Sequence, residues 1–151
     1  MAWYTRQSLD RFLEFSGVRR AIEAAERRTS GEIRVSVAPF FWGSVESAAR
    51  RAFDRLGMTK TRQRNGVLFF IVPSRHRFVV LGDVGIHERV GQEFWHEVVA
   101  TMTPYFRRAE FTDGIVAGIA RAGEELARHF PYDEKTDVDE LSDRVDVREK
   151  P

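Results

Sequence analysis

The sequence predicts an α/β protein, a three-layer α/β/α sandwich in which helices cover both faces of a small mixed central sheet. Residues 67–72 form an unbroken apolar run that is too short for an independent helix and typical of a strand buried on both faces. Residues 32–38 alternate in side-chain polarity, which predicts a second strand. Residues 73–77 begin with Pro73 and have the length and chemistry of a hairpin loop, after which residues 78–81 resume a strand.

The order of these segments sets the topology of the sheet. An amphipathic helix over residues 44–56, with Ser44 as its N-cap, separates the first two strands. The three segments form a βαβ unit, so we expect parallel strands and a right-handed crossover. The third strand returns antiparallel through the hairpin. Further helices are predicted from Ser16 to Gly31, over residues 92–107, and from Thr112 or Asp113 to Phe130.

Length and composition suit one domain with its own core. We divide the 151 residues into an N-terminal helical segment (1–15), the α/β domain (16–130) and an acidic, mostly disordered tail (131–151). The chain has no cysteine, so it offers neither disulfides nor thiolate chemistry. No apolar run approaches the ~20 residues of a membrane span, and the N-terminus lacks the features of a signal peptide. We therefore expect a stand-alone, cytoplasmic protein.

Three loops are predicted to meet at one edge of the sheet, because the parallel strands start there and the antiparallel strand ends there. They are residues 29–32, the basic loop 57–65, and residues 82–88. Asp83 lies between two glycines in the last of these loops. Its carboxylate is either a cap for the following turn or a ligand for Ca²⁺ or Mg²⁺. The candidate co-ligands are Glu88, Glu32 and the amide of Asn65.

Two other groups of residues are candidates for binding. Lys60, Arg62 and Arg64 alternate with Thr and Gln, so the basic loop is either a phosphate-binding loop, with Arg62 as the phosphate ligand, or a solvated surface loop. The aromatic run 40–42, composed of Phe40, Phe41 and Trp42, is either a patch for a protein partner or a lid over the core.

Several segments, taken in order, resemble the TPM domain family. They are the helix at Ile22–Glu26 leading into Thr29-Ser30-Gly31-Glu32-Ile33-Arg34-Val35, then Asn65-Gly66-Val67-Leu68, the Gly82–Gly85 turn, and the pattern Phe106…Gly114-Ile115…Gly118-Ile119. The resemblance covers roughly residues 18–130. It implies a bacterial-type member with an α/β/α fold. It also implies three activities that are attributed to different members: acid phosphatase activity, divalent-metal binding, and a supporting role in the assembly of membrane complexes.

Two functions from different classes follow from these observations. The first is a non-catalytic module that binds a divalent cation and an unidentified protein partner, in support of the assembly or maintenance of a larger complex. The alternative is a weak metal-dependent acid phosphatase, in which Asp83 and Glu88 hold the metal and Arg62 orients the phosphate. Binding of phosphate compounds or nucleic acid through the loop 57–65 ranks last, because the chain has no recognised nucleic-acid-binding motif and a formal net charge of only +1.

Overall fold

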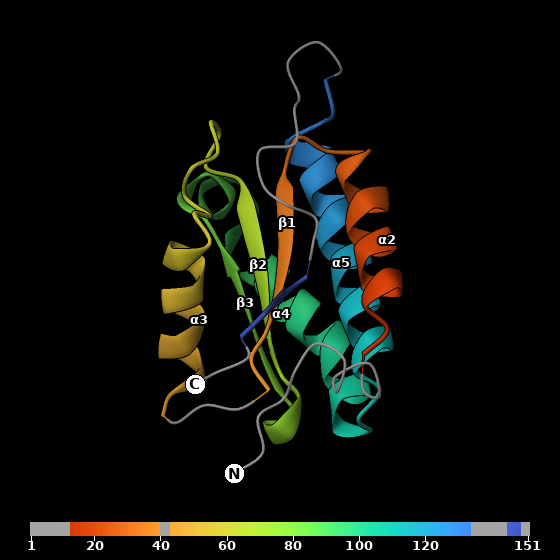
Figure 1. The fold of residues 1–151 in the computed structure, drawn as a ribbon. Helices are drawn as coiled ribbons and strands as arrows, with labels where there is room; N and C mark the ends of the chain where they lie inside the picture. Colours follow the sequence, from red (N-terminus) through yellow and green to blue (C-terminus); the bar gives the residue numbers. More distant parts are fainter. Residues whose placement is uncertain (1–12, 40–42, 134–144, 149–151) are drawn as a thin grey trace.

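The structure is a computed structural model that describes residues 13–39, 43–133 and 145–148 of the chain. Its elements in order are α2 (Phe15–Glu26), β1 (Glu32–Val37), α3 (Val45–Arg55), β2 (Gly66–Val72), the 3₁₀ turn η1 (Pro73–Arg75), β3 (Arg77–Gly82), α4 (Val84–Arg107), α5 (Phe111–His129) and β4 (Asp146–Val147). Helix α3 covers one face of the sheet, and α2, α4 and α5 cover the other (Figure 1). This confirms the predicted three-layer α/β/α sandwich.

The sheet has the strand order β3-β2-β1-β4. Strand β1 pairs parallel with β2, in a register that places Val35 opposite Phe69. Strand β3 pairs antiparallel with β2, and Phe69 lies opposite Val80. The predicted βαβ unit and hairpin are therefore both present. All seven residues of β2 are buried, as expected for a central strand covered by helices on both faces.

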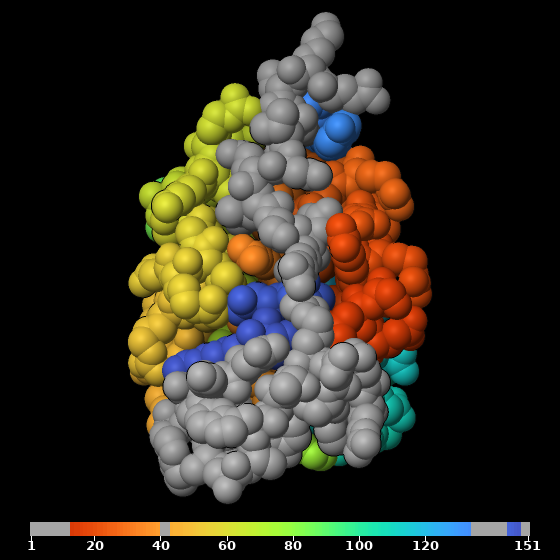
Figure 2. Space-filling view, viewed as in Figure 1, coloured from red at the N-terminus to blue at the C-terminus, as the bar shows by residue number. Residues whose placement is uncertain are grey.

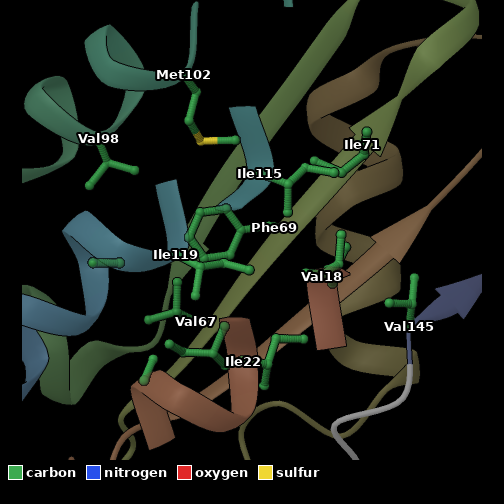
Figure 3. Packing of buried hydrophobic residues seen from close by; sticks show 14 of the residues in the cluster. Val18, Ile22, Val67, Phe69, Ile71, Val98, Met102, Ile115, Ile119 and Val145 are labelled. Atoms are coloured by element: carbon green, nitrogen blue, oxygen red, sulfur yellow. The ribbon is translucent and has the colours of Figure 1, made fainter. Parts of the chain in front are cut away.

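The alternating side chains of β2 separate two hydrophobic cores. The larger core contains Val67, Phe69 and Ile71, which pack with residues of α2, α4 and α5, including Ile22, Met102, Ile115 and Ile119 (Figure 3). The smaller core contains Leu68, Phe70 and Val72, which pack with α3. The unbroken apolar run of β2 thus reflects burial on two faces, because either face alone would require only every second residue to be apolar.

The structure corrects the predicted start of two helices. Helix α2 begins at Phe15 with Glu14 at its N-cap, so Ser16 lies inside the first turn instead of capping it. The helix starts earlier because Phe15 packs against the larger core. Helix α5 similarly begins at Phe111 instead of Thr112 or Asp113, since the Phe111 side chain is buried in the same core.

The region after β3 departs further from the prediction. Residues 82–88 were expected to form a loop, but the structure is helical from Val84 onward, and this first part of α4 joins residues 92–107 across a kink at Gly91. The backbone of Gly91 is left-handed, with φ of 72°, a conformation that glycine adopts without strain. Asp83 becomes the N-cap of this longer helix.

The C-terminal segment contains a strand that was not predicted. Val145 is buried in the larger core, and Asp146 and Val147 pair parallel with β1. Asp146 accepts hydrogen bonds from Ser36 Oγ at 2.7 Å and from Arg55 Nη2 at 2.8 Å. Part of this segment is visible on the surface between α3 and α2 (Figure 2). The expectation of a disordered tail is therefore wrong for these residues, whereas residues 134–144 and the N-terminal residues 1–12 lie outside the described part of the chain.

The carboxylate of Asp146 makes this attachment sensitive to pH. Burial alone would raise its pKa, but hydrogen bonds from Arg55 and Ser36, with the charges of Arg55 and Arg34, hold the pKa below its ordinary value. A carboxyl whose pKa is lower in the folded state stabilises the fold above its unfolded pKa of about 3.9. That contribution disappears as the pH falls through the lowered value.

We predict that Asp146→Asn lowers the free energy of unfolding by about 1–2 kcal/mol at pH 7, because hydrogen bonds to a charged acceptor are lost. Urea denaturation at a series of pH values measures the effect. The difference between wild type and variant should shrink as the pH falls below about 4. Asp113→Asn is the matched control on an exposed acid. Equal stability of the Asp146 and Asp113 variants at pH 7 would contradict the role of Asp146.

Candidate functional site

Three loops meet where β1 and β2 begin and β3 ends, as the topology predicted. The backbone N–H of Glu32 donates to the carbonyl of Asn65 at 3.3 Å, which joins the first loop to the second. The N–H of Asp83 donates to Gly66 O at 2.9 Å, and the N–H of Gly85 donates to Arg64 O at 3.0 Å. The first of these bonds joins the third loop to the start of β2, and the second joins it to the basic loop, so the candidate site is built on backbone hydrogen bonds.

An ion pair between Arg64 and Asp83 reinforces this junction. Arg64 donates from Nε to Asp83 Oδ2 at 2.6 Å and from Nη2 to Oδ1 at 2.9 Å. Asp83 Oδ1 also accepts the Val84 N–H at 2.8 Å, and only 4% of Asp83 is exposed. The hydrogen bonds from Arg64 raise the pKa of its guanidinium, which therefore stays charged. A two-pronged guanidinium–carboxylate pair fixes orientation as well as distance.

Gly85 allows the first turn of α4 to approach the basic loop closely. A Cβ atom built on Gly85 would lie 2.2 Å from the carbonyl oxygen of Gln63 and 2.7 Å from that of Arg64. Both atoms belong to the backbone, so no side-chain rotation could relieve the overlap. The glycine is therefore required because the helix packs closely on the loop. A glycine at this position in the sequence is more typical of a turn, which is why a loop was predicted here.

A buried network of hydroxyl and amide groups lies on the other side of the junction. Ser30 Oγ accepts from Gln63 Nε2 at 3.1 Å and from Asn65 Nδ2 at 3.4 Å. Thr61 Oγ1 accepts the backbone N–H of Asn65 at 3.1 Å. In the described part of the chain, no histidine or carboxylate forms a hydrogen bond with Ser30 or Thr61 that would activate either hydroxyl as a nucleophile.

A pocket of about 500 Å³ opens beside Asp83, between α3 and the start of α4. Its polar walls include Arg50, Asp54, Asp83 and His87, and Phe53 and Trp95 supply aromatic surface. Its remaining lining residues are Thr59, Val80, Leu81, Gly82, Val84 and Gln92. A concave site with a few polar groups among apolar ones is typical of ligand pockets. Arg50 and Asp54 were not among the predicted site residues, since an exposed Arg and Asp one turn apart are ordinary on a helix surface.

The predicted metal ligands are placed unevenly. Asp83, Glu32 and Asn65 are buried around the loop junction, whereas Glu88 is exposed on α4. Among the described residues, no three His, Asp or Glu side chains are grouped so that they could hold a metal ion together. Any cation at this edge would therefore need backbone oxygens, an amide or water to complete its coordination.

The remaining predicted binding residues do not contribute to the described pocket. Arg62, the predicted phosphate ligand, is exposed in the basic loop and absent from the pocket wall. Its neighbour Arg64 instead holds Asp83. The predicted partner patch of Phe40, Phe41 and Trp42 lies outside the described residues.

A sequence model of the TPM domain matches residues 12–125. The chain belongs to the TPM domain family. Among solved structures, it is similar to the BA42 protein of the psychrophilic bacterium Bizionia argentinensis, with 34% sequence identity and a TM-score of 0.84. The match covers 91% of this chain and 96% of BA42. None of the curated proteins matches the chain.

Two more distant structures share the fold. The N-terminal domain of a protein from P. gingivalis is 15% identical, with a TM-score of 0.67 and coverage of 89% of this chain and 99% of that domain. The N-terminal domain of cg2496 from Corynebacterium glutamicum is 11% identical, with a TM-score of 0.51 and coverage of 86% and 75%. No helix in the described part of this TPM domain is both long and apolar enough to cross a membrane.

We predict that Asp83→Asn lowers the free energy of unfolding by about 1–2 kcal/mol, because the buried side chain at this position loses its ion pair with Arg64. Urea denaturation measures the change. Glu88→Gln is the matched control, since Glu88 is an exposed acid on the same helix, and it should stay within about 0.5 kcal/mol of wild type. If both variants lose the same stability, the ion pair does not hold the junction together.

Proposed function

We propose that this TPM domain is a non-catalytic module that binds a divalent cation and a protein partner, and that the cation binds in the pocket beside Asp83. The observation that carries the proposal is the presence of two carboxylates, Asp54 and Asp83, on the wall of one pocket, where water or backbone oxygens would complete the coordination of a cation. Carboxylate oxygens are the ligands that Ca²⁺ and Mg²⁺ prefer. Support for the assembly of a larger complex is the role that best suits such a module.

The composition of the site favours weak binding. Two carboxylates provide few charged ligands, and Asp83 already accepts three hydrogen bonds, two of them from Arg64. A cation that takes an oxygen of Asp83 must compete with the guanidinium of Arg64 or share the carboxylate with it. Sites with few charged ligands bind Ca²⁺ with dissociation constants on the order of 10⁻⁴–10⁻³ M. Binding would also loosen the link between Asp83 and the basic loop, since both use the same oxygens.

The absence of an activated nucleophile favours binding over catalysis. Ser30 and Thr61 accept hydrogen bonds from amide groups, and no described base contacts either hydroxyl. An enzyme that uses a serine or threonine nucleophile needs such a base within hydrogen-bond reach.

Titration of the full chain with Ca²⁺ and with Mg²⁺, followed by amide NMR, tests the cation site. We expect saturable shifts at Asp54 and over residues 82–87 at millimolar cation. Asp54→Asn should weaken binding severalfold without loss of stability, because Asp54 is exposed and forms no ion pair with a described residue. Asp113→Asn, far from the pocket, should bind as wild type does. The absence of saturable shifts up to millimolar concentrations would refute the cation site.

A second candidate is a metal-dependent phosphatase, which is favoured by the phosphatase name of the matching family and by Arg50 on the pocket wall. A guanidinium beside a bound cation could orient a phosphate, and His87 could exchange a proton. We expect Mg²⁺-dependent hydrolysis of an aryl phosphate to be lost in both Arg50→Gln and Asp54→Asn if this function is present. Activity that survives both substitutions would exclude this pocket as the catalytic site.

A further inference from the structure

Among the described residues, strand β3 forms an open edge of the sheet, in contrast to the opposite edge. The order β3-β2-β1-β4 leaves β3 with a single strand neighbour, whereas β4 pairs with β1 at Ser36 and Val37. The strand has the sequence Arg-Phe-Val-Val-Leu-Gly and contains none of the proline, lysine or inward-pointing charges that usually protect an edge within its central residues. Such an edge is a template for another extended chain.

The register identifies which backbone groups of β3 point outward. Asp83 N–H bonds to Gly66 O, and Ala38 N–H bonds to Ile71 O on the other side of β2. Because hydrogen-bonding directions alternate along a strand, the residues of β3 that face β2 are Arg77, Val79 and Leu81. The N–H and C=O groups of Phe78, Val80 and Gly82 therefore point away from the sheet. They form no backbone hydrogen bond with another residue in the described ranges.

The pocket lies along this edge and has walls from both helical layers. Val80, Leu81 and Gly82 line it, together with Phe53 of α3 and Trp95 of α4. Trp95 covers one end, since a Cβ on Gly82 would lie 2.4 Å from its ring. Figure 1 shows α3 on one side of the sheet and the longer part of α4 on the other. A strand added beside β3 would therefore lie between the two helical layers.

Strand β4 shows how the side chains of a strand at the opposite edge of the sheet contact α3 and the larger core. Asp146 of β4 accepts hydrogen bonds from Arg55 of α3, and its neighbour Val145 is buried on the other face of the sheet. The added strand thus directs a charge toward α3 and an apolar side chain toward the larger core. We expect an occupant of the β3 edge to alternate in the same way.

Two exposed charges of α3 define the complementary pattern on the pocket side. Arg50 and Asp54 both line the pocket, and neither forms an ion pair with a described residue. Side chains four residues apart on a helix lie about 5–6 Å from each other. Alternate residues of a strand are about 6.6 Å apart, so two of them could contact Arg50 and Asp54 at the same time. Glu46, earlier in α3, pairs with Arg77, so Asp54 lies toward the Gly82 end of β3. An antiparallel strand would therefore meet Asp54 first and Arg50 two residues later.

We propose that the β3 edge binds an extended segment of a partner protein that carries a basic, an apolar and an acidic residue in succession. The segment adds antiparallel to β3, bonding to the outward groups of Val80 and Gly82. Its basic residue pairs with Asp54, its acidic residue pairs with Arg50, and the apolar residue between them faces Trp95. This is a form of strand addition, in which backbone bonds give affinity and alternate side chains give specificity. The proposal rests on the proposed function only in assigning the domain a protein partner.

Fluorescence anisotropy with a labelled peptide tests the proposal on the full chain. The probe is Thr-Thr-Val-Lys-Val-Glu-Val-Thr, and the control peptide has its Lys and Glu exchanged. We expect the control to bind roughly tenfold more weakly, because two exposed ion pairs are replaced by like charges. The double variant Arg50→Glu with Asp54→Arg should reverse this preference. Both positions are exposed, so the variant should fold.

Val80→Pro tests the backbone contact directly. Proline removes the outward N–H at Val80 but spares the hydrogen bonds to β2, a placement that edge strands tolerate. We expect roughly tenfold weaker binding of the probe, which is the loss of about one hydrogen bond. Circular dichroism establishes that the variant folds. If Val80→Pro does not fold, the proposal is tested by the double charge variant alone, which should prefer the control peptide to the probe.

The proposal is overturned if the probe peptide does not bind at millimolar concentration, or if binding is indifferent to the order of the charges. It is also overturned if the chain sediments as a dimer that Val80→Pro dissociates, because a second copy of the chain would then cover β3. All peptide measurements are made in the presence of a chelator that removes divalent cations, and the cation titration is made without peptide. The cation site and the peptide site can therefore fail independently.

Discussion

The burial of β2 on both faces is the constraint on which the rest of the structure depends. Its six apolar residues supply the centre of both hydrophobic cores, and the strand pairs with β1 and β3. Because β2 pairs with both neighbours, the positions of its two ends in the sheet are fixed, and so are the loops that precede and follow it. The loop before β2 is therefore brought next to the start of β1 and the end of β3, which is where the candidate site lies.

The Arg64–Asp83 pair turns that proximity into a defined site. One carboxylate caps helix α4, holds the basic loop and lines the pocket. These roles compete, because a carboxylate has a limited number of acceptor positions. A ligand that takes Asp83 must therefore act on the loop before β2 as well as on the pocket. Binding at this edge would thus be coupled to the conformation of the loop that contains Arg64.

The parts of the fold that sequence analysis predicts correctly are those determined by local periodicity. The apolar run of β2, the alternation of β1 and the amphipathic α3 each carry their signal within a few residues. The predicted meeting of three loops followed from the direction of these strands alone. Asp83 was recognised as a cap or ligand from its position between two glycines, and the structure shows that it caps α4.

The errors arise where distant contacts decide the structure. Gly85 suggested a turn, yet it is needed because the first turn of α4 packs on the backbone of Gln63. The short strand β4 is held by Ser36 and Arg55, more than ninety residues away, so its local pattern could not predict it. The basic loop offered Arg62 and Arg64 as similar candidates. Only the three-dimensional course of the loop, with Arg64 at φ of 52°, directs Arg64 to Asp83.

The two edges of the sheet differ in a way that bears on function. Strand β4 pairs with the end of β1, whereas no other strand in the described ranges pairs with the outer side of β3, which lies beside a pocket. Hydrogen exchange of the amides of β3 in the free protein tests this account most directly. The account predicts that Val79 and Leu81, whose N–H groups face β2, exchange much more slowly than Phe78 and Val80, whose N–H groups face outward. Uniform protection along β3 would contradict it, because the outward amides would then already have a partner.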